Sequence, residues 1–325
     1  MKRILGLFTF CTLFTIGCKK VSETVSGPIA VGTETVALTH RTCAAQDVLL
    51  AQLAADPSLA ARMQAIENVT ANFVTSHSES YLSNGVVTIP VVVNVLYNTS
   101  AQNISQVQIQ SQIDVLNQDY SGTNGDISNV PAIFIGVKAG DTHIRFVLDQ
   151  VVRKHTNKAS FTTNDAMKKA SSGIAPTSPS TKLNMWSCNM SGGILGYAQF
   201  PGGNPATDGV VIDDNAFGLT NYIPYDKGRT ATHEVGHWLN LRHIWGDANC
   251  GNDFVADTPL HNSANYGCPA SDTRSTCSGN PVMMTMNYMD YTDDLCMYMF
   301  SAGQNARMNA TFTAGGGRTS FTGAQ

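Results

Sequence analysis

Three histidines and a glutamate crowd into the stretch "HEVGHWLNLRH", residues 233–243, of a chain in which charged residues are otherwise sparse. His233 and His237 are four positions apart, so on a helix their imidazoles lie on one face. Neutral imidazoles at this spacing suit Zn²⁺, which takes three protein ligands at a catalytic site and leaves a fourth position for water. Glu234 stands beside the pair, where it can take a proton from that water as it attacks a carbonyl. The pattern predicts peptide hydrolysis.

His243 is the expected third ligand, although it lies six residues after His237. On a continued helix it would face elsewhere, because six residues turn the chain by about 240° around the axis. The helix must therefore stop, and Asn240 permits a left-handed exit because asparagine tolerates that conformation best after glycine. The alternatives are a chance structural cluster and an inactive zinc-binding relic, but the third histidine and Glu234 favour a catalytic site.

Composition and the N-terminus predict an exported globular protein. Hydrophobic residues make up 42% of the 325 residues, enough to bury a sizeable core. The net charge of −4 and the lack of Lys/Arg clusters argue against a nucleic-acid groove, which needs dense cationic patches. A basic start followed by an apolar run predicts a signal peptide over residues 1–17.

The apolar run ends in "TIGC", which resembles the cleavage site of bacterial lipoproteins and predicts lipidation of Cys18. The alternative is plain cleavage and release. No later run is long enough to span a bilayer, so any membrane contact would be through the lipid alone. We expect the protein in the bacterial cell envelope, on the cell surface or secreted.

The rest of the chain reads as an α/β body behind a helical leader. Residues 45–79 are expected to form a separate helical module, divided at Pro57. Apolar patterns predict strands, an edge strand in the Gly-rich segment, and helices. The strands are expected in residues 86–97, 142–151, 182–188, 192–200 and 209–213, and the helices in residues 104–120, 229–240 and 302–312. Past His243 the chain is rich in loops, so other means must stabilise that half.

The zinc stretch resembles the extended motif of metzincin metalloendopeptidases, in which glycine usually occupies the position of Asn240. The segment "NYMDYTDDLCMYMFSAGQNARM" is similar to the methionine turn of the pappalysin family, also called cytophagalysins. The segments "CNMSGGILGYAQFPGG", "ATDGVVIDDNAFG" and "CGNDFVADTP" also resemble that family, from about Val86 onward. The resemblance implies a metzincin-like catalytic domain over residues 80–325. It has a twisted mixed sheet, two main helices above the cleft and a loop-rich, disulfide-stapled lower subdomain.

The resemblance also implies roles for single residues. Met289 would be the turn methionine beneath the zinc ligands, and Tyr291 would donate its hydroxyl to the oxyanion. Core packing is the alternative for both. By the same resemblance "GGILGYA" would be an edge strand that pairs with a protein or peptide substrate in extended conformation, and a surface turn is the alternative there.

Four cysteines lie in the loop-rich half, and an exported chain would oxidise them. Their number allows three pairings, and the resemblance implies Cys250–Cys277 and Cys268–Cys296. In the same half Asp253, Asp257 and Thr258 offer oxygen donors for Ca²⁺, which some family members bind there. Ordinary loop capping is the alternative for these three residues.

Cys43, in the leader sequence "HRTCAAQ", has no obvious partner. Thiolates bind zinc strongly, and Arg41 could pair with an acidic group in the cleft and hold the leader across it. The family resemblance implies a cysteine switch in residues 18–44, so we predict that Cys43 displaces the catalytic water until the leader is cut away. The alternative is a disulfide with Cys188, which stands in an apolar strand where a free buried thiol is common.

Together these patterns predict a secreted or surface-anchored zinc metalloendopeptidase that is made as a zymogen. A catalytically silent surface lipoprotein of the same fold, which binds peptides or glycans, is the alternative from a different functional class. The two differ in what Glu234 does.

Overall fold

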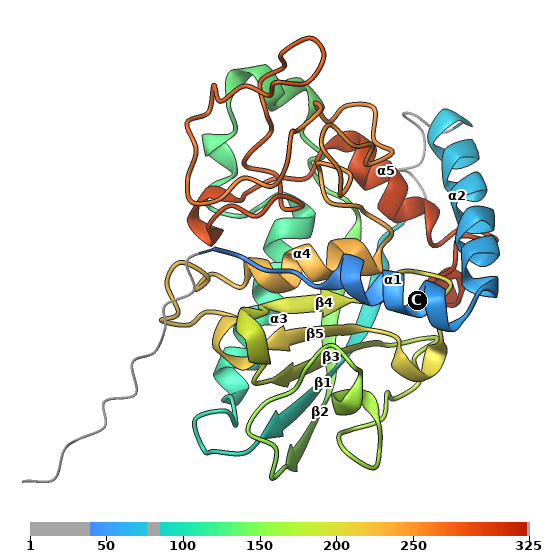
Figure 1. Ribbon diagram of the computed structural model, residues 1–325, viewed down its shortest axis with the longest axis vertical. Coiled ribbons are helices and arrows are strands. Elements are labelled where there is room, and N and C mark those ends of the chain that lie inside the picture. Colours follow the sequence, from blue (N-terminus) through green and yellow to red (C-terminus); the bar gives the residue numbers. More distant parts are fainter. Residues whose placement is uncertain (1–39, 77–84, 324–325) are drawn as a thin grey trace, which may run out of the picture. The chain divides into compact units, whose positions relative to one another are not determined.

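A five-stranded mixed sheet is the framework of the computed structural model, which describes residues 40–76 and 85–323. The predicted signal peptide and the lipidation site Cys18 lie outside the described residues. The strands are β1 (Val87–Tyr97), β2 (Ile144–His155), β3 (Leu183–Cys188), β4 (Gly196–Ala198) and β5 (Val210–Asp213). Their order is β2-β1-β3-β5-β4, and only the β4–β5 pair is antiparallel among these four pairings (Figure 1).

The strands follow from apolar runs that are buried on both faces, as a mainly parallel sheet requires. Val91, Val92 and Val93 of β1 are all fully buried. β2 runs four residues beyond its predicted end, because it pairs with β1 as far as His155. Its second half is half-buried or exposed, and an apolar pattern does not signal such a segment. β4 forms the edge of the sheet that the Gly-rich segment predicted.

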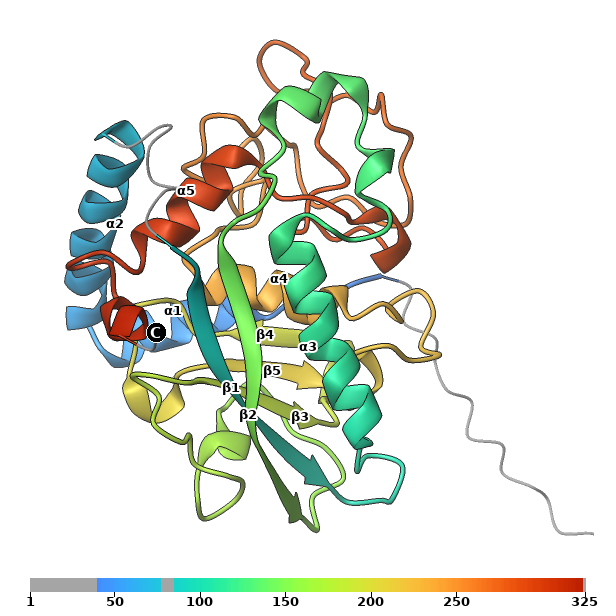
Figure 2. The same ribbon diagram turned by 180° about the vertical axis from the view of Figure 1, so that it is seen from behind.

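Two helices, α3 (Gln106–Ser121) and α4 (Arg229–Trp238), cover one face of this sheet (Figure 2). Ser105 begins α3 by accepting a hydrogen bond from the Gln108 amide, and Gly122 ends it in a left-handed conformation. The apolar side chains of α3 and α4 share one core with β1, β3 and β5. These are the two main helices that the resemblance implied.

The second half of the body is loop-rich, as expected, and it ends in α5 (Ala302–Ala310), which starts with a capping box of Ser301 and Gln304. Two disulfides hold the loops, Cys250–Cys277 and Cys268–Cys296, which is the pairing that the resemblance implied. Short 3-10 helices complete the described elements: Ile127–Asn129, Ala132–Val137, Ala166–Lys168, Ser191–Gly193, Pro205–Thr207, Asp214–Ala216, Asp294–Cys296 and Thr319–Gly323.

The leader forms α1 (Ala45–Ala55) and α2 (Ser58–Ser76), divided at the predicted place. They are not a separate module: α1 buries Val48 and Leu49 along β4, and α2 packs against α5 (Figure 1). Leu49 and Leu59 belong to the main apolar core. The expectation was wrong because the sequence shows that a helix has an apolar face but does not show what that face meets. None of the helices in the described part of the chain is long and apolar enough to cross a membrane.

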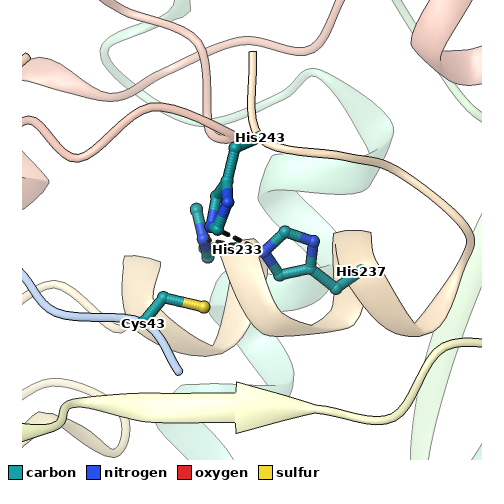
Figure 3. A group of neighbouring side chains, drawn as sticks. All are labelled: Cys43, His233, His237 and His243. Atoms are coloured by element: carbon teal, nitrogen blue, oxygen red, sulfur yellow. Dashed lines mark hydrogen bonds between the residues drawn. The ribbon is translucent and has the colours of Figure 1, made fainter. Parts of the chain in front are cut away.

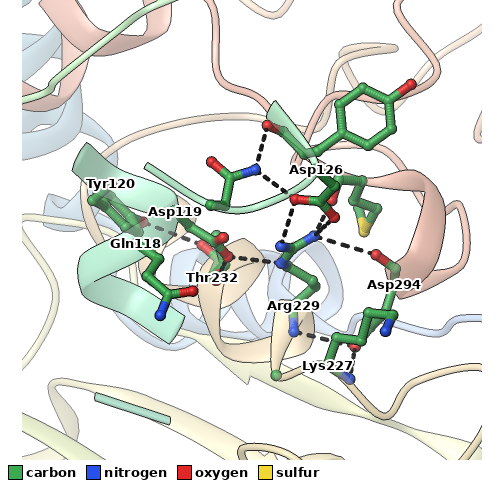
Figure 4. A network of polar contacts seen from close by, with 12 residues as sticks. Gln118, Asp119, Tyr120, Asp126, Lys227, Arg229, Thr232 and Asp294 are labelled. Carbon is green, nitrogen blue, oxygen red and sulfur yellow. Dashed lines mark hydrogen bonds and ion pairs between the residues drawn. The ribbon is translucent and has the colours of Figure 1, made fainter. Parts of the chain in front are cut away.

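A buried polar network fixes the start of α4 (Figure 4). Arg229 lies within 2.9 Å of the Asp119 carboxylate on α3 and within 3.1 Å of Asp126. Thr232, one turn along α4, donates to Asp119 at 2.7 Å. Asp294 accepts the backbone amide of Arg229 at 3.2 Å. The helix that carries the zinc motif is therefore tied to α3 and to the loop-rich half by buried charges.

Replacing Arg229 with Met should destabilise the chain by about 3–5 kcal/mol, because Asp119 is only 4% exposed and would lose its cation. The matched control is Arg145→Met, which removes an ion pair with Asp141 whose two side chains are 30% and 39% exposed. That change should cost no more than about 1 kcal/mol. Urea unfolding of the full-length chain measures both, and equal losses would contradict the importance of the network.

Candidate metal centre and active site

The imidazoles of His233, His237 and His243 converge on one point (Figure 3). The Nε2 atom of His237 lies 3.1 Å from Nε2 of His233 and 3.1 Å from Nε2 of His243. All three side chains are buried, at no more than 1% exposed. The structure thus brings together the three ligands that the spacing predicted.

The hydrogen bonds of the Nδ1 atoms determine which nitrogen of each ring carries the proton. His233 donates from Nδ1 to the carbonyl of Tyr288 at 2.6 Å, and His237 donates to the carbonyl of Leu241 at 2.8 Å. His243 donates to the carboxylate of Asp247. Carbonyl and carboxylate oxygens only accept, so each neutral ring keeps its proton on Nδ1 and presents a lone pair at Nε2.

The lone pair of His237 lies 3.1 Å from those of the other two rings, and such lone pairs repel one another unless a cation lies between them. Burial and the neighbouring imidazoles hold the pKa of His233 and His237 well below the ordinary value, so these rings do not become the cation themselves. Tetrahedral nitrogen ligands of Zn²⁺ stand about 3.3 Å apart, close to the spacing here. The donor set therefore fits zinc.

The fourth donor is the thiol of Cys43, which belongs to the leader. Its Sγ and the three histidine nitrogens all lie within 4.8 Å of one another (Figure 3). Burial and then the charge of Glu234 raise the pKa of this thiol well above its usual value, and a divalent cation among the four donors would reverse that shift. Cys43 and Cys188 are both free and buried, so the disulfide alternative between them is wrong.

The chain leaves α4 as the spacing required. Asn240 has φ of 70°, the left-handed conformation predicted for it. The amide of Leu241 donates to the carbonyl of Gly236 at 2.9 Å, so the chain reverses at once and brings His243 back over the helix. Asn240 therefore replaces the glycine that is usual at this position without loss of the turn.

The methionine turn lies directly against α4. A Cβ on Gly236 would stand 2.5 Å from the sulfur of Met289, so a larger residue at this helical position would force the Met289 side chain to move. The amide of Ile244 donates to the carbonyl of Met289 at 3.1 Å, which ties the turn to the segment that carries the third ligand. Met289 is fully buried against α4, and its role as the turn methionine stays a prediction.

Glu234 points toward the leader and the edge strand. Its Oε2 lies 3.4 Å from Sγ of Cys43, and burial raises its pKa to about 8. A Cβ on Gly196 of β4 would stand 2.9 Å from Cγ of Glu234 and 2.8 Å from the carbonyl oxygen of Val211. The carboxylate and the sheet edge therefore face one another with no room for a larger side chain.

The leader pairs with this sheet edge through a parallel β-bridge between Cys43 and Gly196. The amide of Leu195 donates to the carbonyl of Thr42 at 2.9 Å, and the amide of Ala44 donates to the carbonyl of Gly196 at 3.0 Å. The hydroxyl of Tyr291 donates to the carbonyl of Cys43 at 3.1 Å. Residues 42–44 thus use the hydrogen bonds that an edge strand offers to an extended peptide.

Arg41 anchors the same segment, as the sequence suggested. Its guanidinium pairs with Asp294, donates to the hydroxyl of Thr230 at 3.1 Å and lies 5.1 Å from the centre of the Tyr225 ring. Arg41 is 1% exposed and Asp294 is fully buried. The acidic group expected in the cleft is therefore Asp294.

Comparisons with known proteins agree with this geometry. Residues 188–313 match the family model described as pregnancy-associated plasma protein-A. An extracellular metalloprotease of Arthroderma benhamiae is 33% identical over 238 residues, which cover 70% of this chain and 78% of that protein. Another, from Pyricularia oryzae, is 33% identical over 272 residues, or 81% of this chain and 80% of that protein.

The chain belongs to the pappalysin family of metzincin metalloproteases. Mature mirolysin of Tannerella forsythia, solved with a cleaved peptide, is 43% identical with a TM-score of 0.71, and the match covers 74% of this chain and 96% of that one. A promirolysin mutant is 40% identical with a TM-score of 0.78 over 87% of this chain and 97% of that one. This pappalysin is accordingly a metalloendopeptidase, and its family implies zinc.

The sequence patterns did not predict two neighbours of the third ligand in this pappalysin. Asp247 accepts from Nδ1 of His243, and Trp245 stacks on the His243 ring at 4.3 Å with an interplanar angle of 7°. A carboxylate that orients a ligating imidazole is a common partner in zinc sites. The acidic residue four positions after His243 was the available signal.

The residues predicted to bind calcium take part in hydrogen bonds within the loop-rich half. Thr258 donates to the Asp253 carboxylate at 2.8 Å. Asp257 instead accepts from the hydroxyl of Ser301 at 2.6 Å and from the amide of Gly303 at 2.8 Å, at the start of α5. These hydrogen bonds are compatible with the loop-capping alternative, and calcium binding stays a prediction.

Replacing Gly196 with Ala should destabilise this pappalysin by about 1–3 kcal/mol, because the new methyl group would overlap the Val211 carbonyl and the Glu234 side chain. Gly125→Ala is the matched control, since a Cβ there meets nothing within 4 Å, and it should change stability by no more than about 0.5 kcal/mol. Urea unfolding of the full-length chain compares them. Similar stabilities of the two variants would show that the sheet edge can accommodate a methyl group at position 196.

Proposed function

We propose that this chain is a zinc metalloendopeptidase made as a latent zymogen, with Cys43 as the fourth metal ligand of the latent form. The observation that carries the proposal is the meeting of one thiol from the leader and three imidazoles from the body within 4.8 Å. A closed set of four donors is typical of a structural zinc site, whereas three donors and an open position are typical of a catalytic one. Departure of the leader would convert the first arrangement into the second.

Zinc bound by the three histidines would supply a Lewis acid that polarises a peptide carbonyl and lowers the pKa of water to about 7. Glu234 would take the proton of the attacking water at a carboxylate oxygen and deliver it to the departing amine. Its position supports this role, because Oε2 faces the place that Sγ of Cys43 now fills, 3.4 Å away.

The substrate would be an extended protein or peptide segment that lies where residues 42–44 lie. The carbonyl of Gly196 and the amide of Leu195 would then bond to its backbone. Tyr291, whose hydroxyl now donates to a leader carbonyl at 3.1 Å, would turn that hydroxyl to the oxyanion. Mature mirolysin was solved with a cleaved peptide, which supports peptide binding at this kind of site.

The prosegment also contacts the catalytic body on both sides of Cys43. Arg41 is bound to Asp294 on one side, and α1 and α2 continue on the other side along β4 and α5. The match to promirolysin covers 87% of this chain and the match to mature mirolysin covers 74%, which supports a leader that is lost on maturation. We assign this leader to the segment that ends near residue 79.

Export is supported by relatives named extracellular metalloproteases. We propose anchoring through lipid on Cys18, and calcium near Asp253 stays a secondary proposal. The orientation of Glu234 toward the metal site favours the peptidase over the catalytically silent binding protein.

Cys43→Ala should weaken latency, because the leader loses its bond to the metal but keeps its strand pairing. The variant precursor should lose its leader earlier than the wild type and cleave denatured protein before outside processing. Cys188→Ala, at the other free buried cysteine, is the control and should mature like the wild type. Gel analysis of leader loss over time measures both. A Cys43→Ala precursor that stays fully latent would exclude the switch.

Glu234→Ala in the Cys43→Ala background should lower peptide cleavage by about 10²- to 10⁴-fold while the zinc content stays at one per chain. The three histidines do not depend on Glu234 for their positions, so metal analysis and cleavage should separate. Asp114→Ala, at an exposed carboxylate on α3, serves as the control for loss of charge. Undiminished cleavage by the Glu234 variant would disprove the mechanism.

A further inference from the structure

Glu67 of the prosegment helix α2 is bound by Arg307 of the catalytic body, and the charge of a second arginine, Arg242, also acts on it. Its two carboxylate oxygens accept from Nη1 and Nη2 of Arg307 on α5, at 2.7 and 2.9 Å. Arg307 is 2% exposed at its side chain, and its guanidinium is held by the carbonyls of Asn240 and Phe254 at 3.2 and 3.3 Å. Such a bidentate pair fits a carboxylate in shape as well as in charge.

Arg242 contributes the second positive charge. Its guanidinium carbon lies 4.5 Å from the centre of the Phe200 ring. The groups that act on its charge are Arg307, Glu67 and Asp247, and Asp247 is already engaged by His243. In the described part of the chain, the Nε atoms of Arg242 and Arg307 are buried and have no hydrogen-bond acceptor. The pair therefore holds more donors than Glu67 uses.

This pair lies beside the catalytic centre and in line with the sheet edge. Arg242 directly precedes the third ligand, and the Phe200 ring beneath it lies 5.3 Å from the ring of His237. Phe200 follows β4 by two residues. A peptide along β4 rises about 3.3 Å per residue, so a side chain some two to four residues from the scissile bond would reach the arginines.

Loss of the prosegment would leave two neighbouring guanidinium groups without Glu67. Like charges in a partly buried place repel. Arg307 cannot turn to bulk water without breaking its bonds to the Asn240 and Phe254 carbonyls. A carboxylate from another molecule would restore the arrangement seen in the latent chain.

We propose that Arg242 and Arg307 form a carboxylate-binding subsite of the mature enzyme, which Glu67 fills in the latent chain and an acidic group of the peptide substrate fills afterwards. The proposal rests on the proposed function, since it requires a peptidase whose prosegment leaves. The carboxylate can come from an Asp or Glu side chain or from a peptide C-terminus, and both sources offer the same two oxygens to the guanidinium groups.

The test uses enzyme matured from the full-length chain and quenched fluorescent peptides that differ only by Glu or Gln. The exchange is made in turn at each of the four positions before and after the scissile bond, with free or amidated C-termini. At one position on one side, Glu should raise kcat/KM by about tenfold over Gln. A higher kcat/KM for peptides with a free C-terminus than for amidated peptides would show that the subsite binds the terminal carboxylate.

Variants of the pair give the control. Arg242→Gln should reduce the ratio of kcat/KM for the Glu and Gln peptides toward one. Arg242→Glu should reverse the preference, so that a peptide with Lys at the same position is cleaved best. Arg145→Gln, at a distant surface ion pair, should leave the ratio unchanged. If peptides are cleaved with no preference at any position and no preference for the free acid, the subsite is wrong and the peptidase stands. If matured enzyme cleaves none of the peptides, the proposed function fails, and the subsite fails with it.

Discussion

Three imidazole nitrogens that meet at 3.1 Å with their lone pairs inward are the constraint on which this site depends. Each ring is oriented by an acceptor from a different segment: the methionine turn for His233, the exit of α4 for His237 and the following loop for His243. A cation at the centre would offset the repulsion between these lone pairs. Binding of a metal would therefore stabilise the relative positions of the three segments.

A second constraint is that buried charges are balanced across the boundary between leader and body. Arg41 meets Asp294, and Glu67 meets Arg307, and in both pairs the body partner is almost completely buried. Removing one partner of a buried ion pair costs more than the pair contributes when intact. A leader held in this way is fixed by charge as well as by its apolar contacts with the body. The mature enzyme must then satisfy Asp294 and Arg307 with water or with substrate.

The parts of this site that follow from local spacing were predictable, and those that depend on distant segments were not. The histidine ligands and the left-handed Asn240 follow from turns of one helix, and β1 follows from its apolar run. The pairing of Glu67 with Arg307 joins residues 240 positions apart, and no local pattern signals it. The leader helices were assigned to a separate module for the same reason. The disulfide pairing came from family resemblance, because counting cysteines left three choices open.

The glycine at the sheet edge bears on how the leader of the proposed zymogen would block the site in two ways. Because position 196 has no side chain, the Glu234 carboxylate and the backbone of residues 42–44 can both approach β4 closely. The strand pairing would exclude an extended peptide even if the thiol were absent, and the thiol would fill the open metal position even if the pairing were weak. Both blocks come from adjacent residues of one segment, so a single displacement of that segment removes them together. In the proposed zymogen, latency would therefore depend on the position of this one segment.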